Sequence, residues 1–67
     1  MDNFTVINLD KLIEAHRSAS SYLAKAASLH QRAAKYYEEG DGEKAVECSI
    51  AAHAFQSFAV ESERTAR

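Results

Sequence analysis

The sequence contains no proline and no tryptophan, and only two glycines and one cysteine stand among its 67 residues. A single cysteine excludes an internal disulfide framework, and no spacing of cysteine and histidine resembles a zinc finger. The longest stretch without a formal charge, residues 48–60, is too short for the roughly 20 residues that span a bilayer. The start of the sequence also lacks the basic and apolar regions of a secretory signal. Because a reduced Cys48 suits a reducing compartment, we expect a cytoplasmic protein without a membrane partner.

Most of the other residues in the sequence are good helix formers. Hydrophobic residues make up 46% and charged residues 27% of the chain, which is typical of a folded domain rather than a disordered one. Both glycines stand in the stretch 39–42, Glu-Gly-Asp-Gly, the one strong break in the sequence. We therefore predict a single all-α domain over 1–67: an extended leader (1–8), a helix (9–39), a turn (40–42) and a second helix (42–66). Asn8 and Asp41 are the candidate N-caps of the two helices.

Residues seven apart form rows along both predicted helices. The rows are Leu12/Ala19/Ala26/Ala33, His16/Leu23/His30/Tyr37 and Ala15/Tyr22/Leu29/Tyr36 in the first helix, and Ala45/Ala52/Ala59/Ala66 and Cys48/Phe55/Ser62 in the second. Folding the chain at the glycine turn places Ala33 opposite Cys48 and Ala26 opposite Phe55. Large side chains then meet small ones, as close antiparallel packing requires. We expect the row that begins at His16 to lie between the helices, and the row with Tyr22, Leu29 and Tyr36 to lie outside.

The second helix carries large apolar side chains on more sides than one neighbouring helix can cover. A helix that is apolar nearly all round is normally buried, so we predict that two hairpins form a homodimeric four-helix bundle. The predicted interface consists of Tyr22, Leu23, Leu29, Tyr36, Ile50, Phe55, Phe58 and Val60. Replacing Phe58 by glutamate should then abolish dimerisation. The predicted function is that of a small non-catalytic interaction or scaffold module.

The stretch from Ala33 to Ala52 resembles a tetratricopeptide repeat. Its small, aromatic, turn and alanine positions are matched by Ala33, Tyr36, Gly40, Asp41, Ala45 and Ala52, whereas Arg32 and Ser49 stand where leucine and a large aromatic are usual. The resemblance covers about 20 residues, and one such repeat cannot bury its own face. It implies a second function: an adaptor that binds a peptide or helix of another protein through Tyr22, Leu29 and Tyr36. The chain is also similar to small bacterial His/Ala-rich hairpin proteins of unknown function, which implies no activity.

Candidate chemistry is sparse. His16, His30 and His53 are possible metal ligands, with His30 and His53 close together in the predicted register, but no Glu-x-x-His motif of a di-iron bundle is present. A metal-binding bundle is therefore a third alternative, and no metal, cofactor or catalytic residue is expected. Histidines at a packed interface would make assembly sensitive to pH near 6.5.

Two further features argue against catalysis and nucleic-acid binding. Cys48 stands beside Glu47 at a core position, which does not favour a reactive thiolate, and no glycine-rich phosphate loop exists, so we do not expect an enzyme. Lys11, Lys25 and Arg32 share a heptad column, but the acidic second helix beside it cancels much of its field. Together with the net charge of −2, this argues against a nucleic-acid partner.

Overall fold

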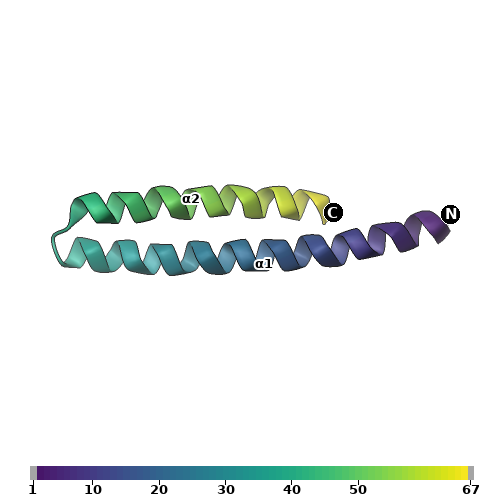
Figure 1. The fold of residues 1–67 in the computed structure, drawn as a ribbon, viewed down its shortest axis with the longest axis horizontal. Helices are drawn as coiled ribbons and strands as arrows, with labels where there is room; N and C mark the ends of the chain where they lie inside the picture. The colour runs from purple at the N-terminus through teal and green to yellow at the C-terminus, as the bar shows by residue number, and fades with distance from the viewer. Residues whose placement is uncertain (1, 67) are drawn as a thin grey trace.

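The computed structural model describes residues 2–66, and the side chains of residues 9–66. Two helices, α1 (Asp2–Glu38) and α2 (Gly42–Thr65), run antiparallel and pack side by side along the whole of α2 (Figure 1). The N-terminal part of α1 extends past the end of α2 (Figure 1). The resulting rod measures 58 × 12 × 11 Å over its Cα atoms. The predicted all-α helical hairpin is therefore confirmed.

The first helix begins earlier than the sequence analysis predicts. α1 starts at Asp2 rather than Leu9, so residues 2–8 are helical instead of extended, and Asn8 lies inside the helix instead of capping it. No proline or glycine precedes Gly40, so nothing in this segment interrupts the ladder of backbone hydrogen bonds. A cap preference of about 1 kcal/mol is too small to end a helix by itself. At their C-terminal ends, α1 and α2 stop at Glu38 and Thr65, each one residue before the predicted end.

The turn between the helices is closed by backbone hydrogen bonds. Gly40 has a φ of +81°, its N–H donates to the carbonyl of Tyr37 over 3.1 Å, and the Asp41 N–H donates to the carbonyl of Tyr36 over 2.8 Å. This pair of bonds around a left-handed glycine is the Schellman motif that ends many helices. Asp41 then caps α2, because its Oδ1 accepts a hydrogen bond from the Lys44 N–H over 3.1 Å. The turn thus reverses the chain within three residues.

Alanine substitutions at the two glycines should have opposite effects on stability. Gly40→Ala forces a Cβ into the left-handed region, which we expect to lower the free energy of unfolding by about 1 kcal/mol. Gly42→Ala is the matched control, because Gly42 begins α2 and a Cβ there meets nothing within 4 Å; we expect it to raise the stability by about 0.5 kcal/mol. Urea unfolding followed by circular dichroism measures both. Equal effects of the two substitutions would contradict this account of the turn.

The core between the helices consists of alanine. Among the described side chains the buried ones are Ala15, Ala19, Ala26 and Ala33 in α1 and Ala45, Ala52 and Ala59 in α2, the last three at most 1% exposed. Alanine has no atoms beyond Cβ, so the two backbones can approach closely. Larger side chains line the rims of this seam, half-buried. The ring contact of His30 with His53 agrees with the predicted register.

One row of the predicted packing is wrong. His16, Leu23, His30 and Tyr37 are exposed, whereas Tyr22, Leu29 and Tyr36 are half-buried against α2. Both rows lie next to the alanine row of α1, three or four residues away, so heptad spacing fits either one equally well. Burying the second row covers Ala15, Leu29 and two tyrosine rings while both imidazoles stay in water, which avoids the cost of burying polar groups.

Candidate functional site

The seam of alanines divides the surface of the hairpin into two lateral faces. On one face, Tyr22 contacts Phe58 and Phe55 with ring centroids 5.3 and 6.2 Å apart, and the Lys25 Nζ lies 5.4 Å from the centroid of the Phe55 ring. We call these four residues the aromatic flank. On the opposite face, the rings of His30 and His53 meet edge to face, 6.0 Å between centroids. The predicted proximity of these two histidines is therefore confirmed.

The face around the two histidines is apolar. Because the helices are antiparallel, the same register pairs residues one heptad away from the histidines on either side. Toward the open end of the hairpin it places Leu23 beside Val60. Toward the turn it places Tyr37 beside Val46. These side chains are 45–57% exposed. We call the six residues Leu23, His30, Tyr37, Val46, His53 and Val60 the uncharged face. It consists of three layers, with a histidine pair between two apolar pairs.

Formal charges are nearly absent from this side of the molecule. On α1, the heptad column next to Leu23, His30 and Tyr37 contains Ile13, Ser20, Ala27 and Ala34. On α2, the heptad column between the alanine seam and Val46, His53 and Val60 contains Ser49, Gln56 and Glu63. Within the described side chains of the two helices, Glu63 is the one Asp, Glu, Lys or Arg in these columns. It lines a hollow with His16, Ala19 and Leu23 near the open end of the hairpin. The other charged side chains within residues 9–66 of the helices lie on the outer columns or beside the aromatic flank.

One polar atom on this side has no partner. Gln56 Oε1 is buried and accepts no hydrogen bond from the described residues. A buried acceptor without a donor costs about 1–3 kcal/mol.

The interface residues predicted from the sequence do not share one surface. Tyr22, Leu29, Tyr36 and Phe55 are half-buried in the hairpin itself. Leu23 and Val60 belong to the uncharged face. Phe58, 51% exposed, contacts the rings of the aromatic flank at tilted angles, and Ile50, 65% exposed, lies on the outer side of α2. The three aromatic and leucine side chains that a tetratricopeptide-type adaptor would use are thus largely occupied by contacts within the hairpin.

Sequence reasoning missed part of the uncharged face. Tyr37 and Val46 are absent from the predicted interface. The sequence identifies His30 and His53 as possible metal ligands or pH sensors, and it places the row of His30 and Tyr37 between the helices of one hairpin. The signal that identifies them is the distribution of charge by heptad column rather than the size of single side chains.

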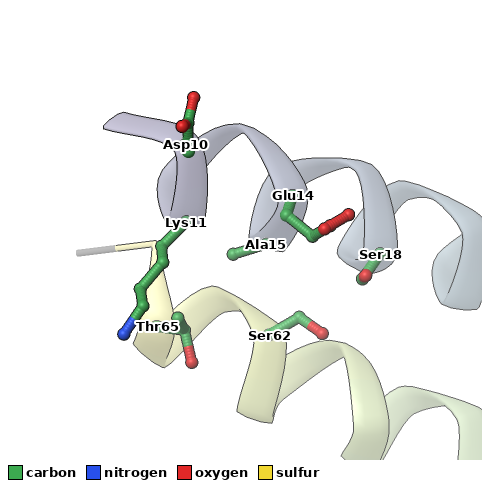
Figure 2. A pocket seen from close by; sticks show the side chains of 7 residues that line it. All are labelled: Asp10, Lys11, Glu14, Ala15, Ser18, Ser62 and Thr65. Carbon is green, nitrogen blue, oxygen red and sulfur yellow. The ribbon is translucent and has the colours of Figure 1, made fainter. Parts of the chain in front are cut away.

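A second hollow, of about 380 Å³, opens between the helices at the end opposite the turn (Figure 2). Its lining residues are Asp10, Lys11, Glu14, Ala15, Ser18, Ser62 and Thr65. Figure 2 shows the Lys11 side chain reaching toward Thr65, while the Asp10 carboxylate points away from α2. Hydroxyl groups line this hollow, but no histidine or cysteine does, so it offers no imidazole to activate a nucleophile.

Neither a metal cluster nor a membrane span is found in the part of the chain that the structure describes. No group of three or more His, Cys, Asp or Glu side chains there could hold a metal ion. Cys48 is half-buried and not disulfide-bonded. Neither α1 nor α2, over the residues described, is long and apolar enough to cross a bilayer.

Comparison with known protein families, with curated proteins and with solved structures gives no match to this chain. The candidate site is therefore interpreted from its own residues, and the uncharged face is its principal feature.

Proposed function

We propose that the protein is a small non-catalytic interaction module that acts as a homodimer. Two hairpins pack through their uncharged faces and form a four-helix bundle. One observation carries the proposal: four large apolar side chains, each 45–57% exposed, share a side of the molecule on which Glu63 is the one formal charge among the described side chains of residues 9–66. Contiguous exposed apolar surface of this kind marks interaction sites.

The thin core of the single hairpin supports association. Among residues 9–66 no side chain larger than alanine is buried. The surface of 5173 Å² exceeds the roughly 4,200 Å² that a compact monomer of this mass exposes. Chains of this length often need a partner for stability. A second copy would cover the apolar surface that one hairpin leaves in water.

The size of the uncharged side fits a stable dimer. The 24 residues of α2 extend about 36 Å at 1.5 Å per residue, and two adjacent helices are about 20 Å wide. The side shared by both helices therefore measures roughly 700 Å², and two copies would bury roughly 1,400 Å² in total, within the range of specific interfaces.

The lack of charge favours a second copy of this chain over a different protein as the partner. In a two-fold dimer each face meets an identical face, so a face with one sign of charge would repel itself. The uncharged face has no such conflict at neutral pH. The lone thiol of Cys48 fits a cytoplasmic location for this dimer.

Sedimentation equilibrium of the wild-type protein over a dilution series at pH 7.5 tests the proposal. We expect a dimer at micromolar concentration that dissociates reversibly on dilution, since interfaces of this size commonly reach micromolar affinity or better. A monomer at every concentration up to the millimolar range would contradict a homodimer. The uncharged face would then have to be occupied by another protein.

A further inference from the structure

We infer that pH controls the assembly of this protein through the histidine pair His30 and His53, with the dimer formed at neutral pH and dissociated in mild acid. The inference rests on the proposed homodimer and adds the regulation of its interface. Histidine is the side chain whose charge ordinarily changes between pH 5 and 8. Because the pair lies within the uncharged face, its change of charge would occur inside the dimer interface.

The pair occupies the middle layer of the face. The two rings come from different helices and lie 6.0 Å apart, edge to face. Both side chains are exposed in the single hairpin, where water solvates a protonated ring. When a second copy covers the face, the same rings lose water and lie between the layers of Leu23 with Val60 and Tyr37 with Val46. A two-fold dimer also places a second histidine pair on the interface.

Two physical effects then oppose protonation in the dimer. Removing an imidazolium from water disfavours its charged form, and a second imidazolium nearby disfavours it further. In the single hairpin both effects are weaker, because water solvates the exposed rings and screens the repulsion between them. The dimer therefore binds fewer protons than two separate hairpins. By linkage, association is strongest above the ordinary pKa of imidazole and weakens as the pH falls through it.

Among the described side chains, no acidic group offsets the charge of this pair. The titratable group that faces His30 from α2 is His53, and the reverse holds for His53. Of the nearest cations along α1, Arg32 and Lys35 line a hollow with Tyr36 on another side of the helix, and Lys25 lies over the Phe55 ring in the aromatic flank. Glu47, the nearest acid along α2, belongs to an outer column. Among the described side chains, the ion pairs are those of Lys44 with Asp41 and Arg64 with Glu61, and neither involves a histidine.

His16 provides a matched control. It lies on the same side of α1, but it lines a hollow together with Glu63. His16 stands two heptads before His30 and takes no part in the ring contact of His30 with His53, so replacing it leaves that contact intact. The pH response is thus expected from the His30 and His53 pair and not from histidine in general.

The test is sedimentation equilibrium at pH 7.5 and pH 5.5, with EDTA present so that no adventitious metal bridges the histidines. For the wild type we expect the dissociation constant to rise about a hundredfold at pH 5.5, roughly one pH unit below the ordinary pKa of imidazole. Each proton excluded from the dimer weakens association about tenfold per pH unit, and the dimer excludes two protons, one from each copy. The H30Q/H53Q variant keeps neutral polar side chains of similar size and should dimerise with less than a threefold change between the two pH values. The H16Q variant should respond like the wild type.

The outcomes separate this inference from the proposed function. A wild-type dimer with the same dissociation constant at both pH values would overturn the inference and leave the homodimer intact. A hundredfold response that persists in H30Q/H53Q would also overturn it. A wild-type monomer at pH 7.5 would overturn the homodimer and the inference together.

Discussion

Replacing Ala52 by leucine is expected to lower the free energy of unfolding by about 1–3 kcal/mol, the usual cost of overpacking a close contact. Ala52 is 0% exposed in the middle of the alanine seam. The additional carbons of leucine have no space unless the helices move apart, which would also break the ring contacts on both sides. Because a chain of this length has a small margin of stability, the substitution should shift the protein toward the unfolded state at room temperature.

Ala54→Leu is the control, since Ala54 is two residues away on the same helix and is exposed. The two variants have the same composition and the same helix propensities. Circular dichroism and urea unfolding should show Ala54→Leu within about 0.5 kcal/mol of the wild type. An Ala52→Leu protein as stable as Ala54→Leu would show that the helices are not packed through alanine.

Replacing Val60 by glutamate is expected to abolish the proposed homodimer and leave the hairpin folded. Val60 is 47% exposed in the single hairpin, so a carboxylate there remains in water until a second copy covers it. In a two-fold dimer two carboxylates would enter the interface without partners, which costs several kcal/mol. We expect the dissociation constant at pH 7.5 to rise by more than about a hundredfold, which corresponds to about 2.7 kcal/mol.

Ile50→Glu is the matched control for Val60→Glu. It introduces the same charge on the same helix, at a residue 65% exposed on the outer side of α2. Sedimentation equilibrium should find this variant dimeric, and circular dichroism should find both variants helical. A dimer lost in Ile50→Glu but kept in Val60→Glu would place the interface around Ile50 on the outer side of α2 and would contradict the uncharged face as the interface.

Much of the architecture was predictable from local signals. The glycines at 40 and 42 and the capping residue Asp41 predict the turn, and the alanine rows predict which stripes of the helices meet. These features depend on residues within one or two helical turns, where backbone conformation and side-chain size act directly. The start of α1 was not predictable in this way, because no residue in 2–8 either requires or forbids a helix.

The sequence by itself determined that the chain forms two helices, where it reverses and that alanines lie between the helices. Only the tertiary structure decided which row beside the alanines is covered, because Leu29 and His30 both satisfy the heptad spacing. That choice depends on the sum of contacts across two helices, which buries Tyr22, Leu29 and Tyr36 and leaves His30 and Tyr37 in water. The uncharged face exists only because two separate columns, one from each helix, are brought together by this packing.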